Sequence, residues 1–433
     1  MTEINEAIYE HFDPHDPALV DDPYTAFAAM RERCPVAHSD QYGGFWALVR
    51  HEDVQAAAAN PEVFASGGGV TLPGMGNPRP LIPLELDGTE HRGYRKLLTP
   101  LFSPRSIAKL EPVIREIVGN LIDGFIEKGQ CDLVTDYSRV LPPSVLAHIM
   151  GVDQEWIPRF IDWSFRILES DPRHPEAESF AAIGELYSYF ENMIDAMRAE
   201  GQAPGESDGN ALEFTDNQRN MLKILLWSEL DGEPLTREAI LDTLLLNVLG
   251  GSDTTNSLIG TALLYLSNHP EERERLRSDP SLIPAVLDEL LRIETPIQGM
   301  ARTVTQDIMF GGQQLHQGDK VLLCWGAANR DPEEFPNPDE VILDRHPNRH
   351  LAFGAGPHRC IGSHLGKLQA QMAIEGILTR LPDFRLADTG TLHWAQGHTR
   401  NLHSFPVVFT PGARRALHDQ THQAVDSPIS QGR

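Results

Sequence analysis

The chain has 433 residues with 62 acidic and 36 basic side chains, which gives a formal net charge of −26. This balance argues against a nucleic-acid-binding surface. The four cysteines lie far apart and form no CxxC pair, so neither a disulfide framework nor an iron–sulfur cluster is indicated.

The N-terminal segment has neither a basic start nor an apolar run, and no stretch of about 18 apolar residues occurs. We therefore expect no secretory signal, no insertion into a membrane and a cytoplasmic location. No linker divides the chain and no internal repeat is visible. Residues 1–411 are expected to form one domain and residues 412–433 a polar, mobile C-terminal tail.

Helical periodicity dominates the first half of the chain and is interrupted by short runs typical of β-strands. A glycine- and proline-rich stretch at residues 67–83 predicts a long loop, a feature that is usually functional or disordered. The pattern predicts strands at 36–38 and 45–49, and helices at 23–34, 52–60, 90–129, 142–150, 154–168, 176–199 and 217–228.

A long helix is predicted to begin after Thr236, which is a good N-cap residue, and to end near Asn268. It is apolar on most faces and should be central in the fold. The remaining pattern predicts helices at 270–277, 282–294 and 361–381, with strands at 308–310 and 320–324. These elements indicate one large unit that is mainly α with small β-sheets.

Residues 353–362 read FGAGPHRCIG and place Cys360 after a Gly/Pro loop, at the start of a predicted helix. Free backbone N–H groups, the helix dipole and the nearby His358 and Arg359 should stabilise a thiolate there. Such a thiolate suits a nucleophile or a metal ligand. A buried structural cysteine and a zinc site shared with His358 and His364 are the alternatives.

The segment FGAGPHRCIG resembles the haem-binding signature of the cytochromes P-450, in which the cysteine is the ligand of the haem iron. The resemblance extends from the helix near residue 23 to about residue 407 and is closest to soluble bacterial members. It implies the cytochrome P-450 fold, with haem b between a long central helix and the cysteine-loop helix. Cys360 is then the iron ligand, and Phe353 and Gly250 lie against the haem.

Glu289 and Arg292 lie three residues apart on a predicted helix and face each other. On its own this spacing would suit an exposed ion pair of small energy. The two residues match the ExxR motif of the family, in which the pair is buried and joined by a third residue, here Arg345. The resemblance implies a structural triad, because buried charges need mutual pairing.

Residues 250–255 read GGSDTT within the long predicted helix, where two glycines cost roughly 1–2 kcal/mol relative to alanine. Small residues there would also suit a close contact between two helices. In the family this motif serves dioxygen activation, and the resemblance gives Asp253 and Thr254 the delivery of protons. Gly250 departs mildly from the alanine of many relatives.

His91 and Arg95 share one face of a predicted helix, an arrangement that suits a carboxylate but also a solvated basic surface. The resemblance assigns His91 and Arg95, together with Arg302 and His358, to the two haem propionates. Four donors for two carboxylates are a sensible chemical complement.

The resemblance implies a monooxygenase that inserts one atom of dioxygen into an apolar small molecule, with hydroxylation expected. Terpenoid, steroid-like and aromatic compounds would suit such a site. A peroxide-driven peroxygenase and a non-catalytic haem sensor or ligand-binding protein are the alternatives, although neither needs Asp253 and Thr254. By family position the pocket draws on the loop at 67–86, the helices around 160–165 and 187–190, the loop around 398–400, and Leu246, Asn247, Ile297, Gln298 and Met300.

The chain has no GxGxxG dinucleotide fingerprint, so electrons are expected to come from outside. The resemblance implies a ferredoxin or flavodoxin and its reductase, with NAD(P)H acting only through these partners. Residues 91–115 hold six basic residues and one acidic residue. This segment is either a docking surface for an acidic electron carrier or a solvated helix face that also supplies propionate ligands.

Overall fold

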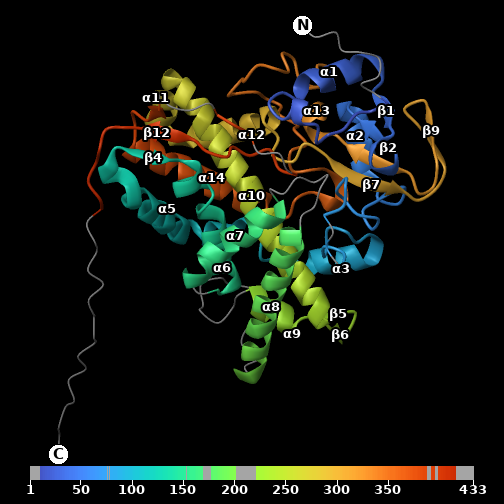
Figure 1. The fold of residues 1–433 in the computed structure, drawn as a ribbon, viewed down its shortest axis with the longest axis horizontal. Helices are drawn as coiled ribbons and strands as arrows, with labels where there is room; N and C mark the ends of the chain where they lie inside the picture. Colours follow the sequence, from blue (N-terminus) through green and yellow to red (C-terminus); the bar gives the residue numbers. More distant parts are fainter. Residues whose placement is uncertain are drawn as a thin grey trace, which may run out of the picture.

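The computed structural model describes residues 10–75, 77, 79–152, 154–168, 177–200, 221–387, 392–394 and 398–415. Its larger part is helical, and a smaller part built on a five-stranded sheet lies beside it (Figure 1). This confirms the expectation of a mainly α fold with small sheets. Among the described residues, no helix combines the length and apolar character needed to span a bilayer. Most of the predicted C-terminal tail, residues 416–433, lies outside the described residues.

Helix α10 (Arg237–Asn268) runs through the middle of the helical part (Figure 1). Thr236 caps its first turn, because the side chain accepts a hydrogen bond from the N–H of Ala239. The prediction of a long central helix is therefore confirmed. The helices that pack against it include α6 (Leu141–Met150), α7 (Ile157–Leu168), α8 (Ala177–Glu200) and α14 (Ser363–Arg380).

The other helices follow the predicted pattern, except that the segment 90–129 is divided and the short helix at Trp325–Ala328 was not predicted. Prolines cause the division: Pro100 follows the end of one helix, and Pro104 and Pro112 occupy the first turns of the next two. The remaining helices are α1 (Tyr24–Arg33), α2 (His51–Ala59), α3 (Gly88–Leu98), α4 (Pro104–Ala108), α5 (Glu111–Phe125), α9 (Met221–Trp227), α11 (Pro270–Ser278), α12 (Ile283–Ile293) and α13 (Trp325–Ala328).

The five-stranded sheet has the order β1-β2-β10-β7-β3. Strand β10 is parallel to β2 and antiparallel to β7, so that Val321 lies opposite both Trp46 and Arg302. The sequence pattern predicts three of these strands but not β7 or β3. Strand β3 has only two residues, and β7 pairs with segments that are distant in the chain. The strands are β1 (Val36–Ser39), β2 (Phe45–Leu48), β3 (Phe64–Ala65), β7 (Met300–Val304) and β10 (Lys320–Leu323).

Seven further strands form smaller sheets. Strands β4 (Gln130–Asp132), β11 (Arg385–Leu386) and β12 (Pro406–Val408) form a three-stranded sheet in the order β11-β12-β4. The other four form two hairpins, β5 (Glu229–Leu230) with β6 (Glu233–Pro234) and β8 (Ile308–Phe310) with β9 (Gln313–Leu315). The largest apolar core lies among the helices around α10, and two smaller clusters involve residues of the five-stranded sheet.

Candidate active site

Cys360 lies in the loop before α14 and not in the helix, which begins at Ser363. The helix predicted to begin at residue 361 therefore begins two residues later, because the chain first closes a turn in which the N–H of Cys360 donates to the carbonyl of Phe353 at 2.8 Å. The loop packs tightly on α2: a Cβ at Gly356, where φ is +66°, would lie 2.4 Å from the carbonyl oxygen of Ala58. Cys360 is accessible to solvent, although protein atoms surround it closely enough to desolvate the thiol.

Desolvation raises the pKa of the Cys360 thiol above its ordinary value. The N–H groups of Gly362 and Ser363 and the charges of Arg95 and Arg359 act in the opposite direction without outweighing it. Backbone N–H groups and nearby charges therefore do favour the thiolate, as expected, but by less than desolvation disfavours it. A bound cation would have to supply the missing stabilisation, as a metal ion does for a coordinated thiol.

The alternative of a zinc site at this loop finds no support. Nowhere in the part of the chain that the structure describes do three or more His, Cys, Asp or Glu side chains gather into a group that could hold a metal. His358 and His364 therefore do not complete a metal site with Cys360. A single thiolate can still be the protein's ligand for an iron that a tetrapyrrole holds.

The two glycines of the GGSDTT segment have different roles. A Cβ at Gly251 would lie 3.0 Å from a side-chain carbon of Leu146, so this glycine permits the close packing of α10 against α6. A Cβ at Gly250 would meet nothing within 4 Å. Gly250 therefore leaves open space beside α10, as a flat ligand would require.

Thr254 and Asp253 are neighbours in sequence but face different spaces. Thr254 lines a large cavity together with Gly250, and its hydroxyl donates to the carbonyl of Gly250 at 2.8 Å. Asp253 borders a separate small pocket beside Arg139 and Phe165. From adjacent positions on α10, the alcohol thus faces the large cavity and the acid faces the separate small pocket.

The Asp253 carboxyl group is buried, and its Oδ2 has no hydrogen-bond partner among the described residues. Burial raises the pKa of Asp253 to about 6. The charge of Arg139 and polar contacts from Asn401, Thr399 and Asn256 lower this pKa, but less than burial raises it. A carboxyl group with a pKa near neutrality can both take up and release a proton at physiological pH.

The structure brings the predicted carboxylate-binding residues into one buried cluster. The rings of His91 and His358 lie with their centroids 4.0 Å apart, and His91 is 4% exposed. Desolvation, with the charges of His358 and Arg95, lowers the pKa of His91 to about 4, and desolvation lowers that of Arg302 to about 10. These values indicate a cluster of donors that a bound anion would stabilise.

Much of the donor capacity of this cluster is unused. The buried Nδ1 of His358 has no partner, and the guanidinium of Arg95 makes no hydrogen bond to any described residue. Within the described part of the chain, Arg302 donates only to the carbonyl of Ala301, at 2.7 Å. Because buried donors of this kind need acceptors, the cluster fits two carboxylates such as haem propionates.

Asp87 belongs to the same cluster and was not identified from the sequence. One carboxylate oxygen lies 3.2 Å from Nε2 of His358, and the other accepts from the N–H groups of Ser66 and Gly67 at 2.8 and 2.7 Å. Asp87 also occupies the N-cap position of α3. That capping pattern was the available signal, but it indicates only a helix start.

Glu289, Arg292 and Arg345 form a buried ionic network. Glu289 and Arg292 are both 0% exposed and are joined by two hydrogen bonds of 2.8 and 2.9 Å. Arg345 donates to both oxygens of Glu289 at 3.1 Å. Although desolvation raises it, the pKa of Glu289 is lowered overall, through its hydrogen bonds with Arg292 and the N–H of Ile342 and the charge of Arg292. The triad links α12 to the segment before the cysteine loop.

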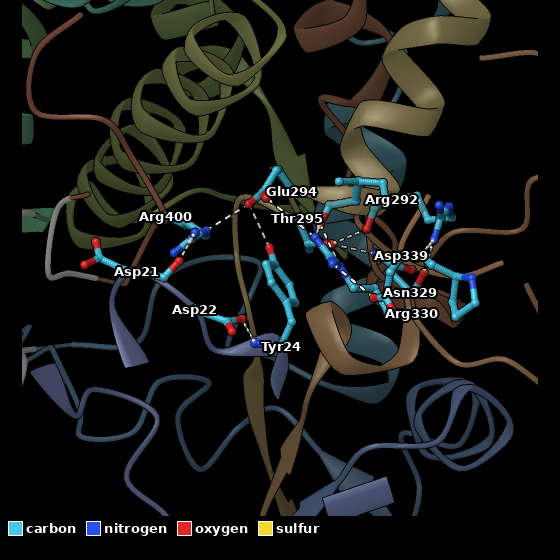
Figure 2. A network of polar contacts seen from close by, with 12 residues as sticks. Asp21, Asp22, Tyr24, Arg292, Glu294, Thr295, Asn329, Arg330, Asp339 and Arg400 are labelled. Atoms are coloured by element: carbon cyan, nitrogen blue, oxygen red, sulfur yellow. Dashed lines mark hydrogen bonds and ion pairs between the residues drawn. The ribbon is translucent and has the colours of Figure 1, made fainter. Parts of the chain in front are cut away.

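A second polar network adjoins Arg292 (Figure 2), and its member Arg400 lines the large cavity. Glu294 accepts from the hydroxyl of Tyr24 at 2.8 Å and from Nε of Arg400 at 2.9 Å. The guanidinium of Arg330 lies 3.5 Å from the centre of the Tyr24 ring, and that of Arg400 lies 5.6 Å from it. These contacts bind α1, the end of α12 and the segment around Arg400 to one another.

The large cavity encloses about 1320 Å³ of empty space, including its mouth. Its lining is mostly apolar and includes four of the five predicted substrate residues, Leu246, Ile297, Gln298 and Met300. The prediction for Asn247 is wrong: it does not line the cavity, and its amide donates to the carbonyl of Thr243 at 2.8 Å.

Two other expectations for the cavity need correction. The helices around 160–165 and 187–190 do not line it, since Phe160 and Phe190 pack with Trp163 and Tyr189 in an aromatic cluster between α7 and α8. The N-terminal segment, from Phe12 to Phe27, forms a wall that was not predicted. The sequence of this segment predicts a helix with one buried face, but it does not predict that the segment packs against the cavity.

Phe353 begins the cysteine loop, and its ring lies 5.9 Å from that of His350 and 6.0 Å from the guanidinium carbon of Arg359. It therefore belongs to the same loop surface as Cys360. The donor cluster fits the propionates of haem b in charge, Cys360 offers a free thiol for its iron, and Gly250 leaves open space beside α10. The fold and these residues define a haem-thiolate protein.

The chain belongs to the cytochrome P450 family, whose model matches residues 72–387. It is 31% identical over 390 residues to the steroid C26-monooxygenase of Mycobacterium tuberculosis, an alignment that covers 89% of this chain and 93% of the relative. The family uses haem b and dioxygen with electrons from redox partners, so the chain is a monooxygenase.

Solved structures agree with this assignment. Cytochrome P450 CYP109Q5 from Chondromyces apiculatus superimposes with a TM-score of 0.80 at 30% identity, covering 94% of this chain and 100% of that structure. CYP109E1 from Bacillus megaterium in complex with testosterone superimposes with a TM-score of 0.76 at 27% identity, covering 90% and 99%.

Proposed function

We propose that this monooxygenase hydroxylates a neutral, largely apolar molecule of steroid-like size, with electrons from an external ferredoxin. The observation that carries the proposal is the mostly apolar lining of the large cavity, whose wall includes Gly250 and Thr254. The similarity to a steroid C26-monooxygenase and to a testosterone complex supports the substrate class. Terpenoid and aromatic compounds are the other classes to be tested.

The chain's own residues have three tasks in this reaction. Cys360 would hold the iron of haem, and His91, Arg95, Arg302 and His358 would hold its propionates. When bound, haem supplies the activation of dioxygen, and a thiolate ligand favours cleavage of the O–O bond. The apolar lining excludes water and positions the substrate, while Thr254 and Asp253 deliver protons from two sides of α10.

The proposal is tested by turnover of the haem-loaded protein with NADPH, a surrogate ferredoxin and reductase, and dioxygen. Steroids, terpenoids and aromatic compounds are first screened for a low-spin to high-spin shift of the Soret band. We expect a steroid-like compound to give the shift and a hydroxylated product. Product formed with hydrogen peroxide but not with the reductase system would contradict it and favour a peroxygenase.

The change of Asp253 to asparagine should lower coupled product formation by at least about 100-fold, the low end of the contribution of a positioned acid. Asparagine has nearly the same shape but cannot carry the proton. NADPH consumption that continues while product falls and hydrogen peroxide rises would identify the lost step. Product formation at the wild-type rate would exclude Asp253 from proton delivery.

The same variant should be more stable than the wild type at pH 8. The folded state holds the Asp253 proton up to a pKa of about 6, against an ordinary value of 3.8, so the wild type loses stability as pH rises through this window. A pKa difference of about two units between the folded and unfolded states corresponds to a gain in unfolding free energy of at most about 3 kcal/mol. Urea unfolding at pH 8 measures the gain, which should shrink as the pH is lowered towards 4.

The electron carrier is proposed to dock on a basic patch formed by Arg92 and Lys96 of α3 and Arg359 of the cysteine loop, all of them exposed. Arg92 and Lys96 share one helix face, and Arg359 lies close enough to Arg95 to lower the pKa of that residue. The patch is beside Cys360, where an electron must arrive.

Reversal of one patch charge by Lys96→Glu should raise the Kd for an acidic ferredoxin about 10-fold at low salt, because it places like charges opposite each other. Arg198→Glu on α8 makes the same charge change at an exposed site outside the patch and is the control. Stopped-flow measurement of haem reduction at several salt concentrations gives the Kd for ferredoxin of each of the two variants. Equal effects of the two variants would place the docking surface elsewhere.

A further inference from the structure

Most polar side chains of the large cavity already have partners within the protein. Arg400 donates to Glu294 at 2.9 Å and to the carbonyls of Val20 and Asp21 (Figure 2). The amide nitrogen of Gln298 donates to the carbonyl of Thr295 at 2.6 Å. A ring nitrogen of His15 lies 2.6 Å from the carbonyl of Leu72, and Thr254 donates to Gly250. These contacts hold the wall, and among the groups they involve the Oε1 of Gln298 keeps a free acceptor, with no hydrogen-bond partner in the described chain.

His398 lines the same cavity and makes no hydrogen bond to any described residue. Its ring packs edge-on against the ring of His15, with the centroids 5.4 Å apart and an angle of 83° between the planes. Since both of its ring nitrogens lack a partner in the described chain, His398 has a full hydrogen-bonding capacity left for a molecule in the cavity.

Two residues after His398, the backbone is held in place through both the N–H and the carbonyl of Arg400. The N–H of Arg400 donates to the carbonyl of Pro296 at 2.8 Å, and its carbonyl accepts from the hydroxyl of Ser257 on α10 at 2.6 Å. The Arg400 side chain is itself fixed by the Glu294 network. A hydrogen-bonding group supported in this way can discriminate between ligands, because little reorganisation is needed on binding.

The surroundings of His398 define the charge of the group that it can bind. Burial lowers the pKa of His398 to about 3, and the nearby His15 lowers it further in the same direction. The ring is therefore neutral at physiological pH and offers one donor and one acceptor. A hydroxyl or a ketone matches this pair, whereas a carboxylate would be buried without a compensating charge.

We propose that His398 binds a hydroxyl or ketone group of the substrate and so selects oxygenated apolar molecules over hydrocarbons of the same shape. The proposal rests on the proposed function and names its substrate class more closely. The loss of one such hydrogen bond, with the partner group left buried, should weaken binding about 5- to 30-fold, equivalent to 1–2 kcal/mol.

The test uses two matched pairs of compounds, testosterone with 5α-androstane and menthol with p-menthane, titrated into the haem-loaded protein and followed by the Soret shift. His398→Phe should weaken binding of the oxygenated member of a pair about 10-fold and change binding of the hydrocarbon by less than about 2-fold. His398→Gln, which keeps a donor and an acceptor, should restore most of the preference.

Thr71→Val is the matched control, because Thr71 is another polar residue of the lining for which no hydrogen bond is found within the described chain. It should leave both affinities unchanged. Equal weakening of both members by His398→Phe, or a loss of preference in Thr71→Val alone, would overturn the assignment to His398. Failure of wild-type protein to bind any member of either pair would instead overturn the proposed substrate class, and this inference with it.

Discussion

The Cys360→Ser protein is expected to lose monooxygenase turnover by well over about 100-fold, since changes to groups that only support a metal ligand already cost 10- to 100-fold. Serine can occupy the same position in the loop but is a much poorer donor of electron density than a thiolate. The long-wavelength Soret band of the ferrous carbonyl complex should also disappear. Retention of that band in Cys360→Ser would show that another residue is the ligand.

The matched control is Cys34→Ser. Cys34 is also a free cysteine, but it lies at the end of α1, where its thiol is near the carbonyl of Val36. Its replacement should leave both turnover and the carbonyl spectrum unchanged. A comparable loss of turnover and of the carbonyl spectrum in both variants would mean that replacing any cysteine by serine damages the protein. It would then not support Cys360 as the iron ligand.

The change of Glu289 to alanine should destabilise the folded protein by about 3–5 kcal/mol, because it leaves the buried Arg292 and Arg345 without a counter-charge. Such a loss is a large fraction of the 5–15 kcal/mol that ordinarily stabilises a native protein. Urea unfolding followed by circular dichroism gives the free energy. The content of bound haem should fall in parallel, because the triad supports the cysteine loop.

The control for Glu289 is Glu274→Ala on α11. Glu274 also pairs with an arginine three residues later, Arg277, at 2.7 Å, but both side chains are exposed to solvent. Its loss should cost less than about 1 kcal/mol, as for other surface pairs. The contrast isolates the effect of burial. Similar costs for the two variants would mean that solvent reaches the triad and that it does not support the fold as proposed.

The triad also predicts how stability depends on pH. Because the pKa of Glu289 is lower in the folded state than its ordinary value of 4.5, its contribution is fully present above that value. The contribution is lost as pH falls through the folded-state pKa. Wild-type protein should therefore lose stability below about pH 4.5 more steeply than Glu289→Gln, a variant that cannot titrate there.

Local signals in the sequence predict the helices well. Thr236 supplies a cap for α10, and prolines mark the starts of α4 and α5, so these boundaries depend on neighbouring residues alone. Strand β7 lies in the interior of the sheet and was missed, because its pairing with β10 and β3 is set by residues far away in the chain.

The candidate site was predictable as a set of residues but not as a geometry. The motifs identify Asp253 and Thr254 together, yet the helix turns their side chains into separate spaces. The cost of burial, which raises the pKa values of Asp253 and Cys360, depends on packing that no local pattern contains. Asn247 was misplaced for the same reason, since one helical position decides which space a side chain faces.

The wall formed by the segment from Phe12 to Phe27 has a consequence for engineering. This segment and the 67–83 loop line the same cavity, although about fifty residues separate them, and Tyr24 ties α1 to Glu294 beside the cavity. If only the 67–83 loop were exchanged for that of a relative, the new loop would pack against an N-terminal segment that did not evolve with it. A chimera intended to transfer substrate preference should therefore exchange both segments together and keep the Tyr24–Glu294–Arg400 contacts intact.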